Sequence, residues 1–175
     1  MSKDKMIVFT IGHSTRKLSE FASILKAYGV RELVDVRTIP RSRANPQFNE
    51  SRLSGFLKRH GILYAHMKGL GGLRHASKDS VNTYWRNTSF RGFADYMQTK
   101  EFAAALGELI EAAGKRQTAI MCAEAVPWRC HRSLIADALS VKHIKVRHIY
   151  SATSCRDHEL TASAKARRGV ITYPG

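Results

Sequence analysis

Short apolar runs alternate with amphipathic stretches along most of this chain. The runs are rich in Ile, Val, Leu and Phe, as is typical of buried β-strands, and they occupy residues 5–11, 31–37, 62–67, 117–122 and 145–150. Between them, apolar residues recur at helical spacing, which predicts helices at 19–28, 49–60, 93–113 and 133–139. The order strand, helix, strand therefore repeats along the chain.

The boundaries of the predicted helices follow from the flanking residues. Ser19 and Asn49 are suited to cap helix N-termini, and the stretch 93–113 is predicted to form two helices that meet near Thr99. Glycines after the apolar stripes are expected to end the helices: Gly29, Gly61 and Gly114. Residues 68–90, which include KGLGGLRH and NTYWRNTSF, are predicted to form a long loop.

This alternation predicts an α/β fold. We expect one domain over residues 1–175, with a mostly parallel sheet of about five strands and helices on both faces, layered as in rhodanese or flavodoxin folds. Residues 151–175 are polar and basic and are expected to form a C-terminal segment of that domain.

Length and composition fit a single globular domain. The 175 residues are 43% hydrophobic, which is enough for a core without disulfides. The apolar run 6–12 is too short for a signal peptide, and no stretch approaches the roughly 20 apolar residues of a membrane helix. We therefore expect a soluble, cytoplasmic protein without membrane association. In that compartment Cys122, Cys130 and Cys155 are more consistent with free thiols, catalytic groups or ligands than with structural disulfides.

The charge of the chain changes this picture, because it suggests a partner. The formal net charge is +15, and residues 37–91 hold eleven Arg or Lys against two acids, Glu50 and Asp79. Residues 92–111 hold four acids and one Lys. A basic region beside an acidic helix indicates a face for polyanions, so the expected partner is nucleic acid or another phosphate-bearing ligand. A generic solvated surface is the plainer interpretation.

Polar residues follow several of the predicted strands. Ligands of parallel sheets bind at the carboxyl ends of the strands, so the segments there are expected to converge: 12–14, 35–37, 68–72, 122–124 and 150–151. We therefore expect an anion or phosphate site at this edge of the sheet, called the carboxyl rim below.

The stretch MCAEAVPWRCHRSLIADAL is the most reactive of these segments. Cys122 ends a strand, and a helix begins after His131. A helix N-terminus favours anions and thiolates, which makes Cys122 a candidate nucleophile and Cys130, His131 and Arg132 a candidate anion seat. A small buried cysteine at a strand end is the plainer interpretation of Cys122. Glu124 is a candidate acid or base, or an ion-pair partner of a nearby arginine.

This loop is similar to a stretched form of the rhodanese loop, and LVDVR at 33–37 resembles a rhodanese strand end. The spacing is longer, because six residues separate Cys122 from Arg129 and nine separate it from Arg132. Metal binding is a third interpretation, through Cys122, Cys130, His131 and His13. Because adjacent Cys and His rarely ligate one zinc and no CxxC pair exists, we expect no metal and no cofactor.

Two other strand ends carry candidate groups. In TIGHS, His13 could act as a base or phosphate donor and Ser14 as an anion ligand or helix cap. In VDVR, Asp35 and Arg37 lie two residues apart, so they share a face of the strand and could pair with each other or with Arg132.

Two loops carry further candidates for anion contact. The basic loop after Arg37 brings Ser42 as a possible phosphate ligand. In KGLGGLRH, Gly71 and Gly72 could expose backbone N–H groups to phosphate, although the spacing matches neither the dinucleotide nor the Walker pattern. The aromatic residues near 84–93 interleave with arginines and could stack bases or pack a corner.

Several blocks together resemble domain-of-unknown-function family 488. They are TIGHST (10–15), LVDVRTIPRSR (33–43), MCAE (121–124), CHR (130–132) and LTASAKARRGVITYP (160–174), with a series between them that includes Tyr64 and LGG (70–72). The resemblance implies that the residues in these blocks, Tyr64 among them, belong to one site. The family is uncharacterised, and the resemblance implies only a loose link to DNA repair.

Three functions remain open from the sequence. The first is an enzyme acting on nucleic acid or a nucleotide, with Arg37 and Arg132 holding a phosphate and Cys122, Glu124, His13 or Asp35 providing the chemistry. The second is a nucleic-acid-binding module without catalysis. The third is a rhodanese-like sulfur or phosphate transferase that uses Cys122.

Overall fold

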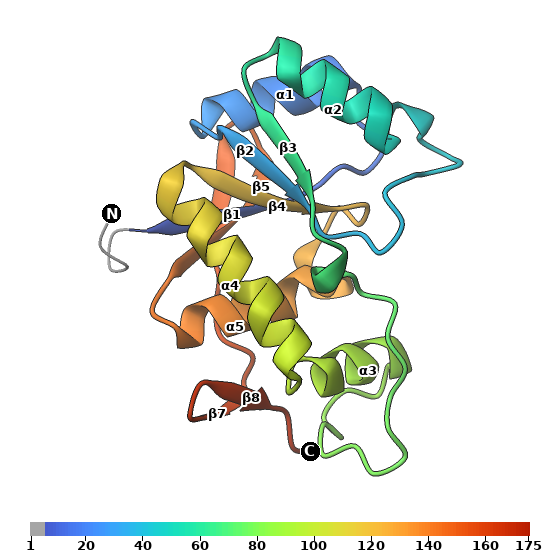
Figure 1. Cartoon of the computed structure of the whole chain (residues 1–175), viewed down its shortest axis with the longest axis vertical. Helices are drawn as coiled ribbons and strands as arrows, with labels where there is room; N and C mark the ends of the chain where they lie inside the picture. The colour runs from blue at the N-terminus through green and yellow to red at the C-terminus, as the bar shows by residue number, and fades with distance from the viewer. Residues whose placement is uncertain (1–5) are drawn as a thin grey trace.

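Six strands form one sheet in a computed structural model that describes residues 6–175 (Figure 1). Their spatial order is β3 (Leu63–His66), β2 (Glu32–Asp35), β4 (Thr118–Cys122), β1 (Ile7–Gly12), β5 (Lys145–Ser151) and β6 (Ser154–Asp157). The first five strands run parallel, and β6 pairs antiparallel with β5. The predicted α/β fold with a mostly parallel sheet is confirmed.

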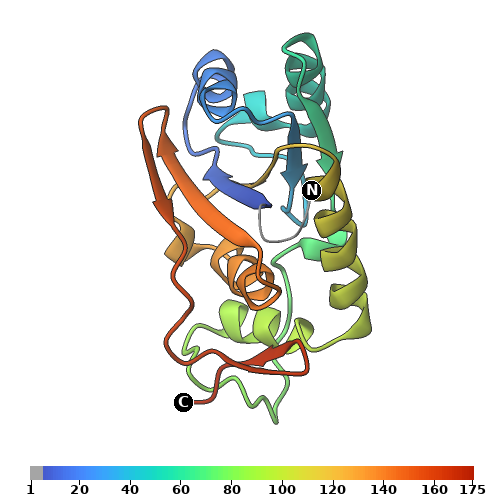
Figure 2. The same cartoon turned by 90° about the vertical axis from the view of Figure 1, so that its left-hand side faces the viewer.

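Helices cover both faces of the sheet, as the alternating sequence pattern predicts (Figures 1 and 2). One face is covered by α1 (Leu18–Ala27) and α2 (Glu50–Arg59). The other is covered by α4 (Lys100–Lys115) and α5 (Arg132–Val141), and α3 (Thr88–Tyr96) packs against this core beside the C-terminal segment, away from the sheet. Three short 3-10 turns complete the elements around the sheet: η2 (Pro46–Phe48), η3 (Lys68–Leu70) and η4 (Pro127–Arg129).

The side-chain alternation of β1 shows why the sheet has two cores. Val8 packs under α4 and α5, whereas Phe9 and Ile11 pack under α1 and α2. Successive residues of a strand point to opposite faces, so a strand with helices on both sides is apolar at nearly every position. This explains the unbroken apolar runs in the sequence.

Most predicted helix boundaries hold, but the ones assigned to Ser19 and Gly114 do not. Thr99 caps α4, because its hydroxyl accepts a hydrogen bond from Phe102 N at 3.2 Å. Gly29 and Gly61 follow α1 and α2 with φ angles of 66° and 72°, the left-handed region that favours glycine. Ser19 lies inside α1, so its prediction as N-cap is wrong, and α4 continues past Gly114. Lys5, predicted to start the first strand, lies outside the described residues.

The sequence also missed the start of α3 and the structure of the C-terminal segment. α3 begins within the stretch predicted to be a loop, where the Asn87 side chain accepts hydrogen bonds from Ser89 N and Phe90 N. The C-terminal residues add β6 to the sheet and form a hairpin of β7 (Lys165–Arg167) and β8 (Val170–Thr172). These strands are short and largely exposed, so they lack the apolar periodicity on which strand prediction depends.

A buried carboxylate on α5 anchors this C-terminal segment. Asp137 is fully buried and accepts hydrogen bonds from Tyr173 OH at 2.8 Å and Thr161 N at 3.0 Å. Its Oδ1 also lies 2.7 Å from His158 Nε2. Within residues 6–175, no helix is long and apolar enough to cross a membrane.

We expect Tyr173→Phe to lower the free energy of unfolding by about 1–3 kcal/mol, because it leaves one buried oxygen of Asp137 without a donor. Urea denaturation measures this. Tyr28→Phe is the control: that hydroxyl also donates a hydrogen bond, but to a backbone carbonyl, Ser151 O at 2.8 Å, and from a half-buried position. An equal loss in the two variants would contradict the assigned role of Asp137.

Candidate active site

The carboxyl ends of β1, β2 and β4 meet at the rim of the sheet. His13 N donates to Cys122 O at 2.9 Å, and Ser14 N donates to Ala123 O at 3.0 Å. Gly12 makes this close approach possible, since a Cβ at that position would lie 1.8 Å from Glu124 O. Segments far apart in the sequence therefore form one surface, as the parallel topology predicts.

Asp35 and Arg37 form a buried ion pair at the end of β2. Arg37 Nη2 lies 2.6 Å from Asp35 Oδ2, and Arg37 Nε lies 2.9 Å from Oδ1. Tyr64 OH donates to Asp35 Oδ2 at 2.7 Å. Burial and the Asp35 carboxylate raise the pKa of Tyr64. The expected pairing of Asp35 with Arg37 is confirmed, and the carboxylate is occupied by partners within the protein.

His13 is buried behind this pair. Its ring is 1% exposed and stacks on Phe48 with the centroids 4.2 Å apart. Nδ1 lies 2.8 Å from Ser14 O, and Nε2 lies 3.4 Å from Arg37 Nη1. Burial, with the charge of Arg37 in addition, lowers the pKa of His13 to about 4. The imidazole is therefore neutral at neutral pH and supports the ion pair from inside the protein.

Arg132 connects the loop after β4 to β1. The side chain is 1% exposed, and each of its nitrogens has a partner. Nε donates to Cys122 Sγ at 3.0 Å, Nη1 to Thr10 Oγ1 at 3.0 Å and Nη2 to Glu124 O at 2.7 Å. Since its donors are used within the protein, Arg132 positions the loop and its cysteine.

The two cysteines of this loop differ in their environment. Burial and the neighbouring Cys130 raise the pKa of Cys122 well above its usual value, despite the opposing charge of Arg132. Burial also raises the pKa of Cys130, but Cys122 and the charge and N–H of Arg132 outweigh it and lower that pKa to about 7. Cys130 is consequently the thiol that ionises near neutral pH.

The start of α5 directs its N–H groups to partners within the chain. Arg132 N donates to Cys130 Sγ at 3.5 Å. Ser133 N donates to Cys130 O and Leu134 N to His131 O, both at 3.1 Å. The sulfur of Cys130 thus accepts from this helix start, which favours its thiolate form.

His131 lies beside Cys130 in a defined tautomer. Its Nε2 lies 2.9 Å from Val36 O and must donate to that carbonyl, so Nδ1 is the free acceptor of the neutral ring. Nδ1 lies 3.5 Å from Cys130 Sγ, and burial lowers the pKa of His131. A base positioned by a third group and facing a thiol is the usual arrangement for activating a cysteine nucleophile.

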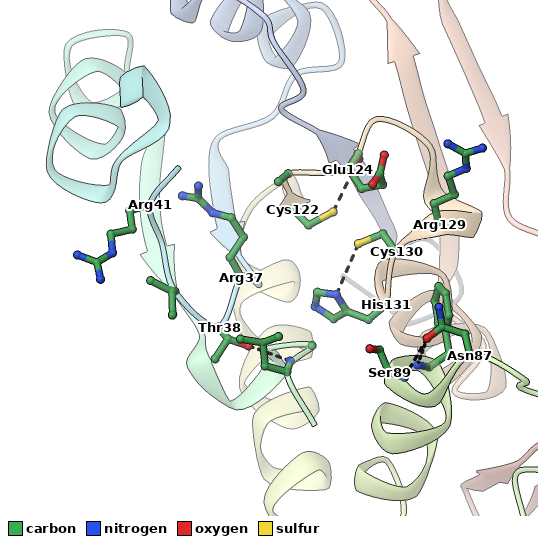
Figure 3. A pocket seen from close by; sticks show the side chains of 15 residues that line it. Arg37, Thr38, Arg41, Asn87, Ser89, Cys122, Glu124, Arg129, Cys130 and His131 are labelled. Carbon is green, nitrogen blue, oxygen red and sulfur yellow. Dashed lines mark hydrogen bonds between the residues drawn. The ribbon is translucent and has the colours of Figure 1, made fainter. Parts of the chain in front are cut away.

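Both thiols line a pocket of about 510 Å³ at the rim (Figure 3). Three arginines also line it: Arg37, Arg41 and Arg129. The remaining lining residues are Thr38, Ile39, Gly72, Leu73, Asn87, Ser89, Phe90, Ala123, Glu124 and His131. The pocket thus combines nucleophilic sulfur, positive charge and an apolar wall.

The structure sorts the site residues that the sequence suggests into three places. Those that line the pocket are Arg37, Gly72, Cys122, Glu124, Cys130 and His131. Those in the packed layer behind it are His13, Ser14, Asp35, Tyr64 and Arg132. Ser42 accepts from Asn45 N within its own loop, and its N–H donates to Asn49. Glu124 forms no salt bridge among the described residues, so its expected ion pair with an arginine is absent.

The glycine pair serves packing against the site. A Cβ at Gly71 would lie 2.5 Å from Thr38 Oγ1, and one at Gly72 would lie 2.6 Å from His131 Nδ1. Only residues without a side chain fit there, so these glycines let the loop after β3 approach His131 closely. Sequence reasoning missed Asn87 and Ser89, because α3 approaches the pocket only in the folded chain, and it considered Arg41 and Phe90 only as parts of a basic loop and an aromatic stretch. Within residues 6–175, no cluster of three or more His, Cys, Asp or Glu side chains could hold a metal ion.

A comparison with protein-family models finds one described as a domain of unknown function, DUF488, that matches residues 17–139. The chain belongs to the DUF488 family. The match covers the two thiols, His131, Arg132 and the three pocket arginines. Searches of curated proteins and of solved structures found no match. The function of this DUF488 protein must therefore be argued from its site.

The buried histidines of the DUF488 chain predict a dependence of stability on acid pH. Burial lowers the pKa of His148 to about 3 and that of His13 to about 4, from 6.5. The unfolded chain binds these protons first, so stability is fully present above pH 6.5 and is lost as pH falls. We expect a loss of about 3 kcal/mol from His13 by about pH 4.

Urea denaturation from about pH 7 to about pH 4 measures this dependence. His148→Gln should flatten the pH profile, because it removes one of the groups that must take up a proton on unfolding. His75→Gln, at an exposed position of the loop before α3, should leave the profile unchanged. An equally steep profile in His148→Gln would contradict the prediction.

Proposed function

We propose that this DUF488 protein is a cysteine-dependent enzyme that acts on a phosphate-bearing substrate, a nucleotide or a nucleic-acid end, in the rim pocket. One observation carries the proposal: the Cys130 thiol faces His131 Nδ1 at 3.5 Å in a pocket that three arginines line. Arg37 is already paired with Asp35, so Arg41 and Arg129 are the lining guanidinium groups that would bind phosphate. A thiolate of lowered pKa is nucleophilic at neutral pH.

The proposed reaction begins at Cys130. His131 Nδ1 takes the thiol proton, and the thiolate attacks phosphorus and breaks the bond to the leaving oxygen. The proton that His131 has taken goes to the leaving oxygen, and Glu124, the one acid among the described lining residues, is assigned as the base for the water of the next step. Water then hydrolyses the cysteinyl phosphate, which releases inorganic phosphate and restores the thiol.

The choice of Cys130 differs from the candidate nucleophile of the sequence analysis, Cys122. The raised pKa of Cys122 keeps this thiol protonated, and Arg132 Nε donates to the Cys122 sulfur at 3.0 Å. Cys130 has both the base and the lower pKa. We therefore propose Cys130, and not Cys122, as the nucleophile of this loop.

Size and charge support a nucleotide or nucleic acid as the substrate. A pocket of about 510 Å³ lies in the range of small-molecule sites, and Ile39, Leu73 and Phe90 offer an apolar wall for a base. The net charge of +15 favours polyanions. A role in DNA repair, which the family resemblance suggests, corresponds to a substrate with a terminal phosphate on DNA.

Sulfur transfer is a second candidate, since two thiols share the pocket. Thiosulfate is a small anion suited to the same arginines. A thiolate would displace sulfite from it and form a persulfide, and cyanide would accept the sulfur as thiocyanate. Sulfur transfer agrees with the resemblance of this loop to the rhodanese loop, and here too we assign Cys130 as the attacking thiol.

The test is turnover by the purified chain of nucleoside monophosphates, of an oligonucleotide with a terminal phosphate, and of thiosulfate with cyanide. Cys130→Ser should abolish turnover, and Cys155→Ser, on β6 across the sheet, should leave it unchanged. Phosphate release that persists in Cys130→Ser would overturn the proposal. Salt-sensitive binding to DNA or RNA with no turnover of any substrate would instead favour a non-catalytic binding module.

A further inference from the structure

We infer that Cys122 and Cys130 form a reversible intramolecular disulfide, which makes the rim pocket a site for reaction with an anionic low-molecular-weight disulfide such as oxidised glutathione. The inference goes beyond the proposed phosphate chemistry and does not depend on it, because it requires only the two thiols and an oxidant. Of the three free cysteines, Cys122, Cys130 and Cys155, only the first two form the proposed bond.

Arg132 brings the two sulfurs together. Its Nε donates to Cys122 Sγ at 3.0 Å, and its backbone N donates to Cys130 Sγ at 3.5 Å. In Figure 3 the two sulfurs point toward one another, and both residues line the pocket. One residue therefore holds two thiols that lie eight positions apart in the sequence.

The third cysteine is separated from this pair. Cys155 lies on β6 and packs against the core under α1 and α2. Cys122 and Cys130 belong to the core on the opposite face of the sheet. Since the sheet lies between them, Cys155 can serve as a matched control for either thiol.

The reaction proceeds by two thiol–disulfide exchanges. The Cys130 thiolate attacks one sulfur of oxidised glutathione; the disulfide bond of the reagent breaks, and one glutathione leaves as a thiolate. Cys122 then gives its proton to that thiolate or to water and attacks Cys130 Sγ, which releases the second glutathione. The protein loses two protons and two electrons, and the glutathione disulfide is reduced to two thiols.

The pocket suits both steps. Arg41 and Arg129 line it beside the Arg37–Asp35 pair and would attract the carboxylates of glutathione. The ionisation order also fits, because Cys130 ionises near pH 7 and attacks first, whereas Cys122 stays protonated until the mixed disulfide has formed. When Cys122 attacks the mixed disulfide at Cys130 Sγ, the glutathione bound to Cys130 is the leaving thiol.

Disulfide formation would change the contacts of the site. Both sulfurs would be withdrawn from their present partners, Arg132 Nε for Cys122 and His131 Nδ1 for Cys130. An oxidised chain would have no free nucleophile at the rim. Any thiol-dependent activity of the pocket would consequently require reducing conditions.

Peptide mapping tests the inference on the full chain. Trypsin cleaves after Arg116, Arg129 and Arg132, so Cys122 falls in peptide 117–129 and Cys130 in peptide 130–132. The folded protein is treated with oxidised glutathione, denatured, alkylated and digested without reductant. We expect a disulfide-linked pair of these peptides in wild type and in Cys155→Ser, and its loss after treatment with dithiothreitol.

The outcomes separate this inference from the proposed function. A linked pair in the native protein supports the disulfide whatever substrate the enzyme turns over. A product in which Cys130 carries glutathione while Cys122 remains alkylated would overturn it, as would no linked pair at any ratio of oxidised to reduced glutathione. The wild-type chain alone decides the result, so a folding defect in a cysteine variant cannot obscure it.

Discussion

Asp35→Asn should lower the free energy of unfolding by about 3–5 kcal/mol, because it leaves the buried Arg37 guanidinium without its charge partner. Asp35 is fully buried and Arg37 is 7% exposed, so water cannot replace the lost carboxylate. Tyr64 would lose an ionised acceptor as well. Urea denaturation at neutral pH measures the change.

The ion pairs of Asp157 provide the control. This carboxylate contacts Lys145 and Arg147 on the exposed side of β5 and β6, so Asp157→Asn should change stability much less. The double variant Asp35→Leu with Arg37→Met should recover part of the loss, since it removes both charges. A loss for Asp35→Asn no larger than that for Asp157→Asn would contradict the buried-pair account.

The second large effect is expected from Arg132→Met on the reactivity of Cys130. The arginine helps to lower the pKa of that thiol to about 7 from 9.0. Its loss should raise the pKa by one to two units and reduce the rate of alkylation by iodoacetamide about 5- to 50-fold near pH 7. The rate is measured by peptide mapping, and circular dichroism confirms that the variant is folded.

Two further variants make this prediction specific. Arg132→Lys keeps a positive charge but loses the forked contacts, so its alkylation rate should lie between those of wild type and Arg132→Met. Arg129→Met removes an exposed charge that lines the same pocket and should have a smaller effect. A rate for Arg132→Met equal to that of wild type would exclude Arg132 as the group that activates Cys130.

The fold was largely predictable because strands and helices leave short-range patterns of apolar residues in the sequence. Apolar runs and helical stripes predicted β1 to β5 and most helix ends. Thr99 marks a helix boundary through its hydroxyl, and Gly29 marks one through its positive φ angle. The C-terminal strands were missed because their residues are exposed and held by distant partners. Tyr173 and Asp137, for example, are joined by a hydrogen bond across 36 positions.

The sequence could predict which segments form the site, but not the contacts that their side chains make. Strand ends of a parallel sheet converge, so the sequence indicates that TIGHS, VDVR and the cysteine loop form one rim. The sequence could not indicate which side chains remain free to bind a ligand. Arg132 was expected to hold a phosphate, but its donors are taken by Cys122, Thr10 and Glu124, and the Thr10 contact spans 122 positions.

The sequence by itself determined the α/β alternation, the basic character of the chain and the gathering of thiols, arginines and histidines at one rim. Each of these follows from composition or from short-range periodicity. Only the tertiary structure decided that Cys130 has the base and the lower pKa, while Cys122 is held by Arg132. The physical reason is that ionisation depends on burial and on contacts within a few ångströms, and those contacts join segments that the sequence keeps far apart.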